Sequence, residues 1–76
     1  MSRKLPALRP KAVMRVLERA DFRLVRVTGS HHIYEHPARP DRIVPVPLHN
    51  RDLKRGTLHN ILKQAGLTEE ELLDLL

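Results

Sequence analysis

Three of the five histidines in this 76-residue chain lie within one short segment, residues 29–36, which reads GSHHIYEH. An exposed imidazole has a pKa near ~6.5, so it can take or give a proton at neutral pH. On a basic surface its natural target is a phosphodiester or the adjacent ribose 2′-OH. The same segment is equally typical of ordinary polar strand residues, and the spacing alone does not separate the two interpretations.

Strand alternation decides which of these side chains reach solvent. If residues 31–36 form a strand, successive side chains point to opposite faces. Tyr34 is expected at least partly in the core, because the chain has one Phe and no Trp to supply other aromatic volume. His31 then projects onto the opposite, open face. Glu35 shares that face, where it either orients the imidazole or is simply a solvated carboxylate.

A metal site is the sharper alternative for the histidines. His31 and His32 point to opposite faces of a regular strand, so they do not ligate one ion together. Pairing of His31 with His49 or His59 remains open, but no carboxylate or cysteine stands at ligand spacing. The sequence also lacks a Gly-rich phosphate loop and a serine nucleophile elbow. We therefore expect neither a metal ion nor a cofactor.

Four basic side chains are candidates for binding phosphate. Arg26 and Arg42, expected on neighbouring strands, could face a phosphate group, or could be charges that keep strand edges from aggregating. Lys54 and Arg55 precede Thr57, the expected N-cap of a helix, and cations beside free backbone N–H groups suit an anion. The alternative for this segment is ordinary helix capping.

The net charge of +5 is unevenly distributed. Residues 1–55 carry thirteen Lys and Arg against five Asp and Glu, whereas residues 56–76 carry one against four. A basic body predicts a polyanionic partner, and the acidic end predicts a protein partner or a solvated face. The alternative is an Arg-rich surface that serves solubility alone.

Length and composition limit the class of protein. The chain is long enough for one domain with a small aliphatic core, and residues 1–9 read as a flexible arm preceding a domain at residues 10–76. The absence of cysteine excludes disulfides and Cys catalysis. Short apolar runs exclude a membrane span, and without a signal sequence the cytoplasm is the expected location.

Apolar residues at helical spacing predict two long helices. The first occupies residues 10–20, with Pro10 in its first turn and Asp21 in the turn that follows. The second begins after Thr57 and ends at Gly66. Thr68 opens a capping box and a short C-terminal helix.

Three strands are expected between the two long helices, at residues 22–28, 31–36 and 42–46. Gly29 and Ser30 form a compact turn, and residues 38–41 form a loop. Pro45 and Pro47 cannot donate ladder hydrogen bonds, so the third strand must lie at a sheet edge. The order α-β-β-β-α, with a short C-terminal helix, predicts an α+β fold: a three-stranded antiparallel sheet with helices on one face and the other face open.

Several segments together resemble the HicA (YcfA-like) toxin family of type II toxin–antitoxin systems. The resemblance rests on the segment that begins at Gly29 and ends at Pro37, and it extends in order over roughly residues 8–75. The supporting segments are Arg19–Phe22, Ile43–Pro47, Leu53–Leu58 and Ile61–Leu67. Asp21 departs from the family, which commonly has glycine there, and this bears on helix capping rather than activity.

The resemblance implies a double-stranded-RNA-binding-domain-like fold and an mRNA interferase that cleaves transcripts without the ribosome. It also implies neutralisation by a HicB-type antitoxin. The family's catalytic histidine lies in a Gly-Ser-His motif and corresponds to His31, with Gly29 and Ser30 as the other motif residues. His32 is a less certain companion, because the family tolerates other residues beside the catalytic histidine.

These observations predict a metal-independent endoribonuclease toxin with RNA and an antitoxin as partners. The alternative from another class is a non-catalytic double-stranded RNA-binding module, since this fold usually binds without cutting. A third alternative is a purely structural adaptor protein, which would show no salt-dependent binding of RNA.

Overall fold

A computed structural model describes residues 5–76 of the chain. Within this range it contains three helices and one three-stranded antiparallel sheet, with strand order β1-β2-β3. The elements in chain order are α1 (Pro10–Arg19), β1 (Arg23–Thr28), β2 (His31–His36), β3 (Arg39–Pro47), α2 (Arg55–Ala65) and α3 (Glu69–Leu75). This is the α+β arrangement expected from the sequence.

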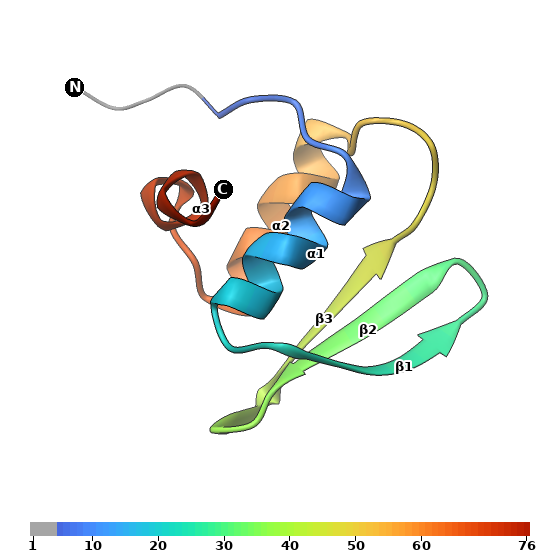
Figure 1. The fold of residues 1–76 in the computed structure, drawn as a ribbon, viewed down its shortest axis with the longest axis vertical. Coiled ribbons are helices and arrows are strands. Elements are labelled where there is room, and N and C mark those ends of the chain that lie inside the picture. Colours follow the sequence, from blue (N-terminus) through green and yellow to red (C-terminus); the bar gives the residue numbers. More distant parts are fainter. Residues whose placement is uncertain (1–4) are drawn as a thin grey trace.

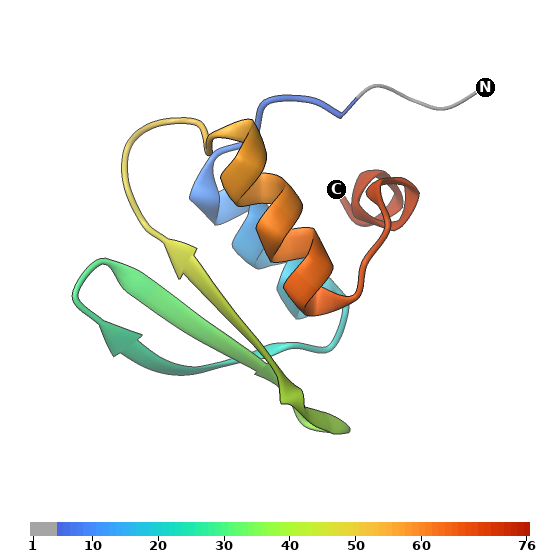
Figure 2. The same ribbon diagram turned by 180° about the vertical axis from the view of Figure 1, so that it is seen from behind.

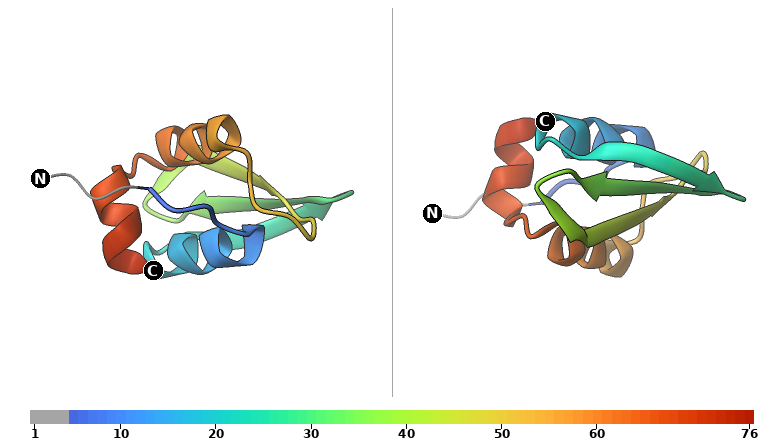
Figure 3. Two further views of the ribbon diagram at one scale, coloured as in Figure 1. Left: turned by 90° about the horizontal axis from the view of Figure 1, so that it is seen from above. Right: turned by 90° about the horizontal axis from the view of Figure 1, so that it is seen from below.

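The two long helices lie side by side over one face of the sheet, and the other face is uncovered (Figures 1 and 2). The short helix α3 lies across one end of this pair, and the β1–β2 hairpin extends beyond the opposite end (Figure 3). None of the helices among residues 5–76 is long and apolar enough to cross a lipid bilayer.

Helix α1 begins and ends as its sequence predicts. Pro10 occupies its first turn and is buried. At the other end Asp21 adopts a left-handed conformation (φ 72°), and the Phe22 N–H donates to the Leu17 carbonyl at 2.9 Å. Asp tolerates this conformation better than most residues, so it can reverse the chain into β1.

Helix α2 starts three residues earlier than expected. Its N-cap is Lys54, which has extended backbone angles and makes no side-chain capping bond. Thr57 therefore lies inside the first turn and is not the cap, because the Lys54 carbonyl already accepts from the Leu58 N–H. The helix ends at Gly66 (φ 72°), and Thr68 forms the expected capping box of α3.

The sheet differs from expectation mainly in its third strand. β3 begins at Arg39, so the predicted loop at residues 38–41 is reduced to a tight turn. The Ala38 N–H donates to His36 Nδ1 at 3.1 Å, and this turn brings Arg39 opposite His36. A register irregularity after Glu35 accommodates the extra residues of β3. The strand lies at a sheet edge, as its prolines predict.

The segment before α1 is packed where the structure describes it. Leu5 is buried, and the Leu53 N–H donates to the Leu8 carbonyl at 2.7 Å. Residues 5–9 therefore do not form the loose arm that the sequence suggests, because Leu5 and Leu8 add apolar area to a small core. Residues 1–4, the rest of that arm, lie outside the described range.

The core between helices and sheet is almost entirely aliphatic. Leu17, Ile61 and Leu72 are fully buried from the three helices, and Val44 is fully buried from β3. Tyr34 is the one tyrosine of the chain and is 3% exposed. Burial raises the pKa of its phenol, and the nearby Glu18 carboxylate raises it further.

We predict that Tyr34 makes the protein sensitive to alkali. A phenol whose pKa is raised by folding contributes stability that is present below pH ~10, its unfolded value, and is lost as pH rises through the folded pKa. Ultraviolet titration of this single tyrosine should show a midpoint above ~10 that moves down to the ordinary value in denaturant. A folded-state midpoint at the ordinary value would contradict the burial described above.

Candidate functional site

The central strand β2 divides its side chains between the two faces of the sheet. Tyr34 is buried towards the helices, and His31 is exposed, as strand alternation predicts. His31 lies opposite Thr28 of β1 and Pro47 of β3. Because directly opposed residues of antiparallel strands share a face, Thr28 and Pro47 flank the imidazole on the uncovered side.

A β-bulge in β1 determines where Arg26 points. Leu24 lies opposite Tyr34 and Arg26 lies opposite Ile33, so Val25 is an extra residue between two consecutive pairs. Without the bulge, Val25 would oppose Ile33 and Arg26 would turn towards the helices. The bulge therefore places Arg26 on the same face as His31, in a diagonal position where Cα atoms are ~7–8 Å apart and a long side chain can reach.

Arg42 does not join this face. It precedes Ile43, which lies opposite Glu35 on the uncovered side, so alternation directs Arg42 towards the helices. Its guanidinium packs against Gly66 at the end of α2, where an added methyl group would overlap it. Arg42 therefore lies on the opposite face of the sheet from Arg26. The two are not on neighbouring strands as expected, because β2 lies between β1 and β3. Contact of Arg42 with phosphate stays a prediction.

Glu35 shares the face of His31 but is too far away to orient it. The two residues are four positions apart on one strand, and a strand advances ~3.3 Å per residue, which separates them by ~13 Å. Glu35 lies opposite Arg23 instead. On the uncovered face, His31 thus lies at the hairpin end, and Arg23 and Glu35 lie opposite each other at the far end.

The neighbours of His31 in the sequence fix the hairpin. Gly29 supplies the positive φ (59°) that the turn needs. The Ser30 carbonyl accepts from the Leu48 N–H at 2.7 Å, which ties the turn to the segment after β3. His32 faces the helices, and its Nδ1 is buried with no hydrogen-bond partner among residues 5–76. These placements leave His31 as the one imidazole of β2 on the uncovered face.

Lys54 and Arg55 are both exposed, but they lie apart from His31. They stand at the start of α2, at the far end of the loop that leaves β3 (Figure 1). Within residues 5–76 no group of three His, Cys, Asp or Glu side chains could hold a metal ion.

A family model for the HicA toxin of bacterial toxin–antitoxin systems matches residues 10–67. The chain belongs to the HicA toxin family. The match runs from the start of α1 to just beyond α2 and includes the whole sheet, so it confirms the resemblance carried by the Gly-Ser-His segment. α3 lies outside it. No curated protein matches the chain.

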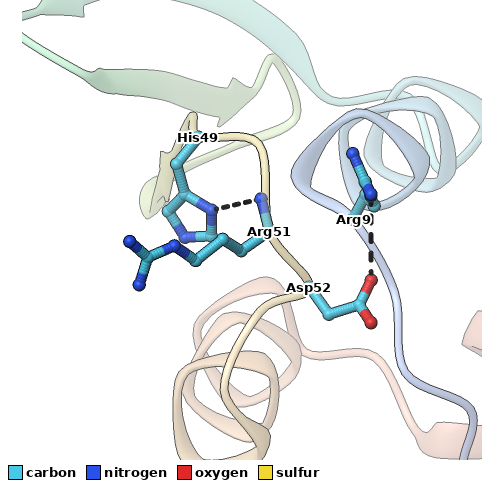
Figure 4. A network of polar contacts seen from close by, with 4 residues as sticks. All are labelled: Arg9, His49, Arg51 and Asp52. Atoms are coloured by element: carbon cyan, nitrogen blue, oxygen red, sulfur yellow. Dashed lines mark hydrogen bonds and ion pairs between the residues drawn. The ribbon is translucent and has the colours of Figure 1, made fainter.

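Sequence reasoning missed the basic residues that gather at the hairpin end of this HicA family member. Figure 4 shows Arg9, His49 and Arg51 around the loop after β3. The Arg51 N–H donates to His49 Nδ1 at 3.2 Å, and Arg9 pairs with Asp52 at 4.0 Å. The signal was weak, because these residues are far apart in the sequence and meet only when β3 ends beside the hairpin.

We predict that Arg42 and Arg26 contribute differently to the stability of the fold. Arg42→Gln should lower the free energy of unfolding by about 1 kcal/mol, because the guanidinium packs against Gly66 at the C-terminal end of α2, where a cation is favourable. The matched change Arg26→Gln on the exposed face should alter stability by less than about 0.5 kcal/mol. Urea unfolding of both variants measures this, and equal losses would contradict the assigned orientations.

Proposed function

We propose that this HicA-family toxin is a metal-independent endoribonuclease that cleaves mRNA with His31 as its catalytic residue. The observation that carries the proposal is the position of His31: exposed, on the sheet face that no helix covers, beside the hairpin turn. The family supports the assignment as a toxin, and the site supports the chemistry.

The uncovered face suits a nucleic acid strand. Arg26 lies on it by virtue of the bulge at Val25, in diagonal reach of His31. The basic excess of residues 1–55 makes RNA the natural polyanion. Stacking of bases on aromatic side chains is not available, because Phe22 and Tyr34 are both buried. Phosphate contacts must therefore supply most of the affinity.

The proposed reaction is proton transfer at a phosphodiester. The neutral His31 imidazole takes the proton of the attacking hydroxyl, either the ribose 2′-OH or a water molecule. A new P–O bond forms and the bond to the leaving oxygen breaks. That oxygen takes up a proton from the His31 imidazolium or from water. General acid–base help is worth about 10²–10⁴-fold, so cations such as Arg26 must supply further stabilisation of the phosphorane charge.

We predict that His31→Ala abolishes cleavage of RNA and growth arrest while leaving RNA affinity within about twofold, because the imidazole transfers protons and contributes little to binding. Cleavage by the parent protein should persist in EDTA. His59→Ala, an exposed histidine on α2 that contacts Glu69 at 3.5 Å, is the matched control and should stay active.

Two results would contradict this assignment. Unchanged cleavage by the His31→Ala variant would remove His31 from the reaction. Binding without cleavage by the parent protein would favour the non-catalytic RNA-binding module.

A toxin of this family requires an antitoxin partner, and we propose that a HicB-type antitoxin covers the uncovered face. Ile43 lies opposite Glu35 on that face and is 49% exposed. Leu24 and Val27 of the edge strand β1 lie opposite Tyr34 and His32 on the other side of the sheet, and they are 47% and 54% exposed. An interface that covers the open face and continues around the β1 edge would bury this apolar area together with His31.

We predict that the antitoxin and RNA exclude each other from the toxin, because both bind the sheet face that carries His31. In the complex, His31 should be protected from diethylpyrocarbonate, whereas His59 on the helix side should still react. Mass spectrometry of the modified peptides provides the measurement. A ternary complex with RNA, or full reactivity of His31 in the bound toxin, would rule out direct occlusion.

A further inference from the structure

A pocket at the hairpin end of the molecule is lined by residues that the proposed reaction does not use. It lies between the start of α1 and the loop after β3, with a volume of about 250 Å³. Its lining residues are Arg9, Pro10, Lys11, Leu48, His49 and Asn50. Most of these are basic or can donate hydrogen bonds, and the walls at Pro10 and Leu48 are apolar.

The charge in this pocket is largely uncompensated. Asp52 neutralises Arg9, to which it is paired at 4.0 Å. Lys11 and the neighbouring Arg51 guanidinium have no acidic partner among residues 5–76. A pocket with a surplus of cations attracts an anion. If RNA is the substrate, as proposed, a phosphate of its backbone is the candidate anion.

His49 is oriented as a hydrogen-bond donor into this surplus of positive charge. The Arg51 N–H occupies Nδ1, as Figure 4 shows, so Nδ1 is the acceptor and the proton of the neutral ring resides on Nε2. The backbone contact thus fixes one tautomer, and Nε2–H is left to donate to a phosphate oxygen.

The pocket is also joined to the candidate catalytic residue. The Leu48 N–H donates to the Ser30 carbonyl, and Pro47 lies opposite His31. From His31 to Pro47 is ~5 Å across the ladder and from Pro47 to His49 at most ~7 Å along the chain, so the Cα atoms of the two histidines are within ~12 Å. A short stretch of RNA backbone spans that distance.

We propose that this pocket is a nucleotide subsite, which binds a backbone phosphate of the RNA near the bond that His31 attacks. Lys11 and His49 Nε2–H contact the phosphate, and Pro10 and Leu48 contact the sugar or base. The proposal rests on RNA being the substrate, but it is tested without cleavage. A subsite here would make the loop between β3 and α2 one of the elements that position the RNA strand.

The test uses the full-length protein and NMR titration with a 5′-nucleoside monophosphate, and in parallel with inorganic phosphate. Amide shifts that saturate at Lys11 and residues 48–50 are expected, with tighter binding of the nucleotide than of phosphate if the apolar walls contribute. Lys11→Met should weaken nucleotide binding by at least about tenfold, as expected for a lost charge-assisted contact. Lys63→Met on α2 is the matched control and should have no effect.

Two replacements of His49 separate its possible roles. His49→Gln keeps a distant N–H donor but loses the contact with the Arg51 N–H, whereas His49→Asn keeps an acceptor for that N–H and loses the distant donor. The proposal predicts that nucleotide affinity is retained better in His49→Gln. The reverse order would show that His49 only shapes the loop.

Shifts spread equally over Lys54, Arg55 and other surface cations, or no saturation, would overturn the subsite. They would leave the ribonuclease assignment intact, since that assignment depends on His31 and on cleavage. Loss of cleavage in His31→Ala with unchanged nucleotide binding would support both.

Discussion

Burial of Tyr34 between the sheet and the helices fixes the direction of every other side chain on the central strand. Tyr34 lies opposite Leu24 on one side and Val44 on the other, and Val44 is fully buried. A shift of β2 by one residue would expose the tyrosine and bury His31. The energetic penalty of exposing the one large aromatic residue of the sheet therefore maintains the imidazole on the uncovered face.

Local patterns in the sequence predict most of the fold. Apolar spacing locates α1, the Gly-Ser turn locates the hairpin, and the capping box at Thr68 locates α3. The start of α2 is missed because Thr57 is a good N-cap by type, whereas tertiary packing of Leu53 and Leu58, both buried, draws the helix start back to Arg55. At this position, burial of apolar side chains outweighs the N-cap propensity of Thr57.

The candidate site is less predictable, because it depends on register. Alternation along a single strand suffices for His31. Arg26 and Arg42 require knowledge of the bulge at Val25 and of the strand order, neither of which has a signal within a few residues. The pocket around His49 is harder still, since it forms only when the end of β3 is placed against the hairpin and the start of α1.

Charge is separated along the molecule as well as along the sequence. The acidic end of the chain serves packing: Glu71 caps α3, Glu69 contacts His59, and Arg19 donates to the Leu75 carbonyl at 2.7 Å. These contacts lie at the end opposite the hairpin (Figure 3). The acidic residues of α3 thus lie away from the basic hairpin end, where Asp52 pairs with Arg9 and leaves Lys11 and Arg51 to a polyanion.

The proposed function requires that RNA is held on the uncovered sheet face, with the phosphodiester to be cleaved next to His31. It is tested most directly by mapping amide shifts of the His31→Ala variant, which should not cleave RNA, upon addition of a short RNA. The account predicts the largest changes on β1 and β2, at Arg26, Thr28 and residue 31. Changes confined to the exposed faces of α1 and α2, with β1 and β2 unaffected, would contradict it.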